Sequence, residues 1–178
     1  LQNNLKVARE VFRQTGQVRF SQEKIAWEAV NQVTKQPQRV ELPKMEVGSQ
    51  WLGQNWDVTK SSPIVDKVQE LVGGTCTIFQ RMNEAGDMLR VCTNVKSKDG
   101  RRAISTYIPA RNPDGTPNPV IAQVLAGSTY VGRAKVVDDW YFAAYEPIRD
   151  DKNQIVGMLY YGIKQEGMPD LRQGIMDI

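Results

Sequence analysis

The residues at the start of the chain are spaced as on one face of a helix. Leu1, Leu5, Ala8, Phe12 and Thr15 follow one another at intervals of 4, 3, 4 and 3 residues. A stripe with this period is typical of an amphipathic helix whose apolar face packs against another element. The pattern therefore predicts that the chain opens with a helix.

A second helical pattern follows a break at Gly16. Ser21 stands where it can cap a new helix, and Pro37 prevents that helix from continuing. The buried face of this segment consists of five apolar residues: Ile25, Ala26, Ala29, Val30 and Val33. We therefore expect residues 1–36 to form a long N-terminal helical segment.

Residues 37–62 have no sustained period, and their apolar positions alternate only weakly. Trp51 and Trp56 lie here among glycines and amide side chains. A stretch of this length without regular structure is unusual inside a compact domain. The two tryptophans indicate that it packs onto the core.

Two short helices have clear boundary signals. Ser62 and Pro63 favour the start of one, and Gly73 favours its end. Asn118 and Pro119 provide the same start signal for the other. We expect one helix before the strands and one among them.

From residue 75 onward the apolar positions alternate with a period of two, which predicts strands. Six are expected, over residues 75–82, 88–95, 101–108, 129–137, 140–148 and 154–164. Separate runs of helices and strands indicate an α+β fold. We expect a PAS-like domain in which the long N-terminal helix packs on an antiparallel sheet of about six strands.

The length and composition favour one globular domain with a binding function. The chain has 178 residues and no histidine, which excludes histidine-based catalytic triads and the common zinc and haem sites. Its net charge is +3, and the basic residues are scattered where a nucleic-acid surface needs a one-sided basic stripe. We find no catalytic set of residues, and expect neither an enzyme, nor a metal site, nor a nucleic-acid partner.

Two of the expected strands place tyrosines and small residues on a common face. The sets are Tyr130, Gly132 and Ala134 in one strand, and Tyr141, Ala143 and Tyr145 in the next. Small residues between tyrosines leave space above a sheet, and such a space suits a small ligand. The same pattern fits ordinary core packing with hydroxyl groups at the surface.

Arg102 stands between apolar residues in an expected strand. A guanidinium in such a strand can pair with a carboxylate, and its geometry also fits a ligand carboxylate through two hydrogen bonds. An edge strand with the side chain in solvent is the alternative. Arg81, Arg90 and Arg133 are weaker candidates for the same role.

Cys76 and Cys92 lie on opposite strands of the first expected hairpin. With Gly86 as the third residue of the loop, Ile78 faces Cys92 and Cys76 faces Asn94. The cysteines are then diagonal neighbours about 7–8 Å apart, which is beyond the usual reach of a disulfide. We expect two buried free thiols.

Segments along nearly the whole chain resemble single Cache sensor domains. They are AVNQVT at 29–34, VELP at 40–43, TIFQRMN at 77–83, MLRV at 88–91, TNV at 93–95, GRRAI at 100–104, glycine 127 with YVGRA at 130–134, WY at 140–141, YEPI at 145–148 and GMLYYG at 157–162. The closest type is the single Cache domain of the third class, found on bacterial methyl-accepting chemotaxis proteins.

This resemblance implies a periplasmic domain of an inner-membrane receptor that is anchored by membrane helices outside the chain, is homodimeric and is without a cofactor. Residues 1–178 would form the domain, with the sheet in 63–166, and 167–178 would lead to a membrane helix. The implied ligand is a short carboxylate such as acetate or pyruvate. The residues carried over by position are Arg102, Tyr107, Tyr130, Tyr141 and Tyr145. Strand parity supports Tyr107 least, because it places this side chain opposite Arg102.

Other assignments remain open. The domain could serve a histidine kinase or a diguanylate cyclase in place of a chemotaxis receptor. It could also be a cofactor-binding PAS domain, or a domain that only contacts a protein partner.

Overall fold

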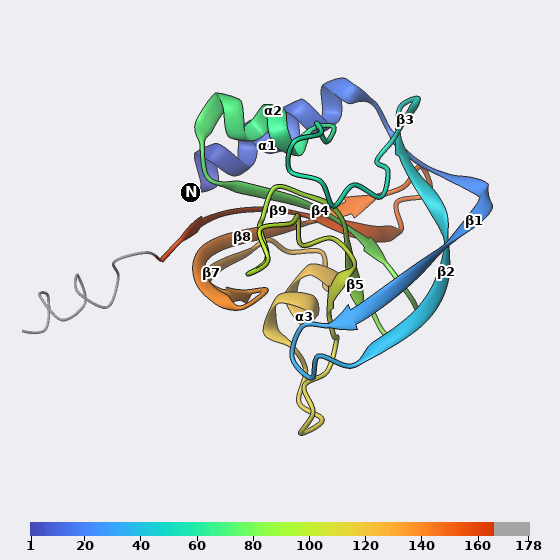
Figure 1. Ribbon diagram of the computed structural model, residues 1–178, viewed down its shortest axis with the longest axis vertical. Coiled ribbons are helices and arrows are strands. Elements are labelled where there is room, and N and C mark those ends of the chain that lie inside the picture. Colours follow the sequence, from blue (N-terminus) through green and yellow to red (C-terminus); the bar gives the residue numbers. More distant parts are fainter. Residues whose placement is uncertain (166–178) are drawn as a thin grey trace, which may run out of the picture.

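The computed structural model describes residues 1–165. Its elements in chain order are α1 (Gln2–Thr15), β1 (Val18–Asn31), β2 (Pro37–Val47), β3 (Gln50–Trp51), α2 (Val65–Val72), β4 (Thr75–Arg81), β5 (Met88–Thr93), β6 (Thr106–Ile108), α3 (Pro119–Leu125), β7 (Tyr130–Val136), β8 (Asp139–Arg149) and β9 (Ile155–Lys164). The helices α1 and α2 lie on one face of a sheet and α3 lies on the other (Figure 1). The expected C-terminal segment, 167–178, lies outside the described residues.

The nine strands form one sheet in the order β3-β2-β1-β6-β5-β4-β9-β8-β7. All neighbouring pairs are antiparallel except β1 and β6, which are parallel. The α+β class is as expected, but the prediction of about six antiparallel strands is wrong. The six expected strands correspond to β4–β9, and the part of the chain before residue 62 adds three more.

The sheet buries apolar side chains on both faces. The cluster under α1 and α2 includes Leu5, Trp27 and Tyr161, and the cluster under α3 includes Phe79 and Ile121. Burial on both sides explains why the hairpin of β4 and β5 carries apolar residues on both of its faces.

The helix α1 confirms the first predicted helix. Leu5 and Ala8 are its buried residues, and the chain leaves the helix at Gly16. Gly16 has a φ of 141°, and a Cβ atom there would lie 2.5 Å from the Cα atom of Gly48. Only glycine fits this close approach between two backbones.

The prediction of a second helix within residues 1–36 is wrong, because β1 occupies that place. Trp27 and Ala29 are 3% and 0% exposed, while Ala26 and Glu28 between and beside them are exposed. This alternation has the period of a strand, and Trp27 is not part of the helical stripe predicted for this segment. The helical segment therefore ends at Thr15.

Residues 37–62 also contain regular structure that the sequence pattern hid. The strand β2 pairs with β1 from Val30↔Pro37 to Val18↔Val47, with a bulge in β1 between Phe20 and Lys24. The extra residues at the bulge lie in β1, so β1 also departs from strict two-residue alternation.

The strand expected at residues 101–108 is mostly irregular. Only Thr106–Ile108 forms β6, and Ser105 before it has a φ of 77°. A positive φ interrupts an extended strand, so the residues around Arg102 leave the sheet. Arg102 keeps a single bridge to Lys96.

The short helix α3 confirms its predicted start. The side chain of Asn118 accepts hydrogen bonds from the backbone N–H groups of Val120 and Ile121, at 2.9 and 3.1 Å. Pro119 occupies the first turn, where no N–H donor is needed. The cap fixes the end of α3 beside β7.

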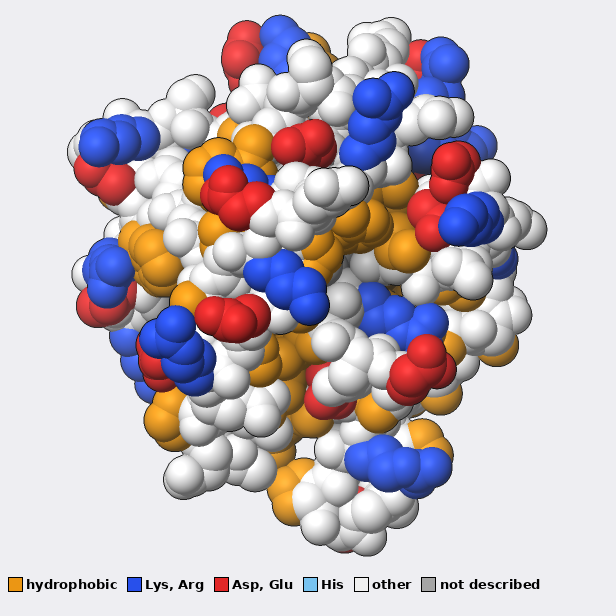
Figure 2. Space-filling model, turned by 90° about the vertical axis from the view of Figure 1, so that its right-hand side faces the viewer, with side chains coloured by type: hydrophobic (Ala, Val, Ile, Leu, Met, Phe, Trp, Pro, Cys, Tyr) orange, Lys and Arg blue, Asp and Glu red, His pale blue; other side chains and the backbone are white. Residues whose placement is uncertain are grey.

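Charged side chains of both signs are interspersed over the face that Figure 2 shows, and apolar side chains line a hollow between them. No patch of one charge sign dominates that face.

The hairpin of β4 and β5 has the predicted pairing around its cysteines. Ile78 pairs with Cys92, and the N–H of Cys76 donates to the side chain of Asn94 at 2.8 Å. Both cysteines are buried and free, as expected. Burial raises the pKa of the Cys92 thiol to about 12, and that of Cys76 further.

We expect both thiols of the native protein to resist a thiol-reactive dye at about pH 8, because the thiolate is the reactive form and its fraction is very small. After denaturation without reductant, two thiols should react. A denatured, unreduced protein without a reactive thiol would contradict the pairing seen here.

Candidate ligand-binding site

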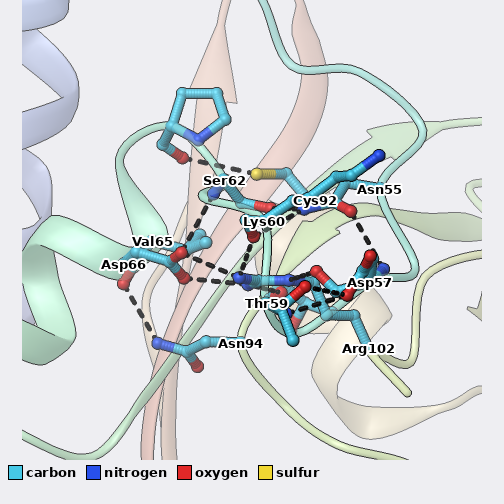
Figure 3. Close-up of polar contacts among 12 residues, drawn as sticks. Asn55, Asp57, Thr59, Lys60, Ser62, Val65, Asp66, Cys92, Asn94 and Arg102 are labelled. Carbon is cyan, nitrogen blue, oxygen red and sulfur yellow. Dashed lines mark hydrogen bonds and ion pairs between the residues drawn. The ribbon is translucent and has the colours of Figure 1, made fainter.

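Arg102 is buried beside β5, where its guanidinium is fully bonded to the protein (Figure 3). Its Nε donates to the carbonyl of Asp57 at 3.2 Å. Its Nη1 donates to the carbonyl of Thr93 at 3.0 Å and its Nη2 to that of Lys60 at 2.7 Å. Both terminal nitrogens also donate to the carboxylate of Asp66, each at 2.8 Å. All five N–H donors are thus in use.

Asp66 is the anion that compensates Arg102. Burial acts to raise the pKa of Asp66, but the hydrogen bonds from Arg102 and from the N–H of Ser62 outweigh it and leave that pKa below its ordinary value. The pair ties α2 and the 52–64 loop to the end of β5. Arg102 therefore has a structural role in this geometry, and no N–H group remains for a ligand.

Tyr107 lies in the cluster under α1 and α2, and it is nearly buried. The remaining predicted tyrosines lie on the other face of the sheet, under α3. The structure therefore separates both Arg102 and Tyr107 from the other three.

Tyr130, Tyr141 and Tyr145 do come together. Tyr130 is the partner of Tyr145 across β7 and β8, and their ring centroids are 6.2 Å apart. A fourth tyrosine that the sequence analysis missed, Tyr160 of β9, lies 5.0 Å from Tyr145 and 6.5 Å from Tyr141. Tyr160 is the direct partner of Tyr145 in the sheet, so correct pairing of the last two strands would have indicated it.

Beside these tyrosines lies Arg90 of β5, which has no exposed surface. Its Nη2 donates to Oε1 of Gln32 at 2.6 Å and its Nη1 to the hydroxyl of Thr106 at 3.1 Å. Its Cζ stands 5.0 Å from the centroid of the Phe79 ring. Burial lowers the pKa of the Arg90 guanidinium. Within residues 1–165 no carboxylate pairs with it.

Two buried polar atoms on this face have no hydrogen-bond partner among the described residues. They are Nε of Arg90 and the hydroxyl of Tyr145. Burial raises the pKa of Tyr145, so its hydroxyl stays protonated and can donate. A buried charge without a counter-ion costs several kcal/mol, and native proteins seldom leave buried donors unpaired. These two donors are therefore available to an anion.

A cavity of about 450 Å³ lies on this face, with Tyr145 but not Arg90 among its lining residues. Its walls include Gln32 and Tyr145, which both neighbour Arg90, together with Tyr130. The rest of the lining includes three basic residues and one acidic residue: Lys35, Arg133, Lys135 and Asp138. The volume is in the range of small-molecule sites, and a positively charged rim attracts anions.

The groups that meet here are a guanidinium, an amide and phenol hydroxyls. All can donate hydrogen bonds to an anion. Among residues 1–165, no three His, Cys, Asp or Glu side chains gather as metal ligands do. The arrangement is a candidate anion-binding site on one sheet face of a PAS-like α+β domain.

Comparison with known families agrees with this class. The Cache 3/Cache 2 fusion domain matches residues 1–178, and the chain therefore belongs to that family. Cache domains are small-molecule sensors and are typically extracellular. A search of curated proteins finds no match. None of the helices within residues 1–165 is long and apolar enough to cross a membrane.

Proposed function

We propose that this protein is the periplasmic sensor domain of a transmembrane methyl-accepting chemotaxis receptor, a binding module without enzymatic activity. Its ligand is a short carboxylate such as acetate or pyruvate, held by Arg90. The observation that carries the proposal is the fully buried Arg90 guanidinium, which has an unpaired Nε and no carboxylate partner among residues 1–165. A histidine kinase or a diguanylate cyclase could use the same sensor.

The proposed site differs from the one inferred from the sequence. It keeps Tyr130, Tyr141 and Tyr145 and replaces Arg102 by Arg90. A ligand carboxylate placed against Arg90 accepts from Nε and from a terminal nitrogen, which is the strong two-bond geometry for this pair. The Tyr145 hydroxyl completes the set as a further donor. Arg102 and Tyr107 support the fold and do not contact the ligand.

Contacts behind the tyrosines offer a path for the signal. Glu146 follows Tyr145 on β8 and points to the opposite face, where both of its carboxylate oxygens accept from Arg9 of α1, at 2.9 and 2.8 Å. The hydroxyl of Tyr161, next to Tyr160, likewise accepts from Asn4 of α1 at 3.2 Å. A ligand that moves the two tyrosines therefore moves residues that hold α1.

The ligand class is tested by thermal unfolding with a panel of small molecules. Acetate and pyruvate should raise the melting temperature, while acetamide and ethylamine of similar size should not. A ligand at 100 times its dissociation constant stabilises the folded state by about 2.7 kcal/mol, which is a shift of about 5–10 °C for a domain of this size. If amines raise the melting temperature and acids do not, the use of Arg90 as an anion site is refuted.

A further inference from the structure

Two turns that are distant in the sheet meet beside the cavity. Gln32, after β1, donates from Nε2 to the carbonyl of Lys135 at 3.0 Å and accepts at Oε1 from the N–H of Val137 at 3.2 Å. Lys35, three residues further on, forms an ion pair with Asp138 at 2.8 Å. These five residues make up what we call the seam.

The seam is held by side chains alone. Four strands, β6, β5, β4 and β9, separate β1 from β8 in the sheet, so no backbone ladder joins the two turns. The side chains of Lys35 and Asp138 are 57% and 27% exposed. Exposed ion pairs are weak, so the Lys35–Asp138 contact can open at little cost, while the bonds of Gln32 form the buried part of the seam.

The residues of this contact line the cavity. Gln32, Val33 and Lys35 line it from one turn, and Lys135 and Asp138 line it from the other. We propose that the seam is the gate through which a small molecule reaches Arg90. The claim that a small ligand of Arg90 passes through this gate rests on the function proposed above.

Gln32 connects the gate to the occupant of the site. Its Oε1 is shared between Nη2 of Arg90 and the N–H of Val137. A carboxylate is a stronger acceptor for a guanidinium than an amide oxygen is. A bound anion therefore takes over Arg90 and leaves Gln32 to Val137, so the seam closes over the ligand.

The gate itself is tested without any ligand. Ala134→Cys places a thiol on the cavity wall, and its reaction with neutral methyl methanethiosulfonate measures access. Lys35→Asn and Asp138→Asn should each raise that rate about 1.5- to fivefold, because each removes one exposed ion pair. The exchanged pair Lys35→Asp with Asp138→Lys restores the contact and the slow rate. Asparagine and aspartate suit residue 35 because its φ is 65°.

The same chains without Ala134→Cys give the baseline from the two native cysteines, and melting temperatures confirm folding. Equal rates in all variants would show that access does not use the seam. Backbone amide exchange at Val137 is a second measure that needs no added thiol. It should rise about 1.5- to fivefold in Lys35→Asn.

Saturating pyruvate should slow amide exchange at Val137 in the wild-type protein. If pyruvate binds and this exchange does not slow, the coupling through Gln32 is wrong. If pyruvate and the other acids do not bind at all, the proposed function fails, while thiol access and ligand-free exchange still decide whether the seam is a gate.

Discussion

Replacement of Arg90 by methionine should abolish carboxylate binding and leave the fold intact. A paired buried charge loses about 2–5 kcal/mol when one partner is removed, which raises the dissociation constant at least about thirtyfold. Stability should stay equal or rise, because a buried charge without a counter-ion is replaced by an apolar chain of similar length. Calorimetric titration and urea unfolding measure the two effects separately.

Gln32→Glu is a second and more specific test of anion binding by Arg90. Glutamate has the shape of glutamine, and its carboxylate lies where Oε1 now accepts from Nη2 of Arg90. The protein then supplies its own anion, so binding of acetate or pyruvate should fall, although the second carboxylate oxygen loses the bond that Nε2 donates to the carbonyl of Lys135. Arg19→Gln, at an exposed position on β1, is the matched control and should leave binding unchanged.

Binding and stability of the Arg90→Met protein together show whether Arg90 is a binding residue or a structural one. If Arg90→Met unfolds the domain, the guanidinium is a structural group. If Arg90→Met binds acids as the wild type does, the anion lies elsewhere. Only lost binding together with retained stability supports the proposed site.

The sequence predicted that tyrosines share one face of the sheet, as they do, but it gave no reason to prefer Arg90 to Arg102. Alternation in two adjacent strands is a local pattern, and it placed Tyr130 and Tyr145 together. The choice between Arg90 and Arg102 depends on which of them meets a carboxylate. Asp66 is 36 residues away from Arg102 in the chain, and only the packing of α2 on β5 brings the two together. No local pattern contains that information.

The errors in the predicted fold also arise because local patterns do not contain contacts between distant segments. Trp27 and Ala29 alternate correctly, but alanines and valines nearby also satisfy a helical stripe, so β1 could be assigned either way. Pairing with β2 and the parallel contact with β6 decide the matter, since both are contacts between segments distant in the chain. The α3 cap at Asn118 was predictable because all its partners lie within three residues.

Asp66→Asn should destabilise the domain by about 2–3 kcal/mol in urea unfolding, because it leaves the Arg102 guanidinium buried without an anion. This loss of stability is smaller than that expected for a fully buried ion pair, since the Asp66 side chain is 31% exposed. Glu10→Gln removes an exposed ion pair with Arg13 on α1 and is the control, with an effect of about 0.5 kcal/mol or less.

The stability that Asp66→Asn loses should depend on pH. The folded-state pKa of Asp66 is lowered, so its contribution is present above the unfolded value of about 3.9 and disappears as the pH falls through the folded value. Wild type and Asp66→Asn should therefore converge in stability in acid. Carboxylate affinity near neutral pH should be the same in both proteins, because Arg102 contributes no donor to the ligand. A folded Asp66→Asn or Arg102→Met protein that no longer binds carboxylates would return the binding role to Arg102.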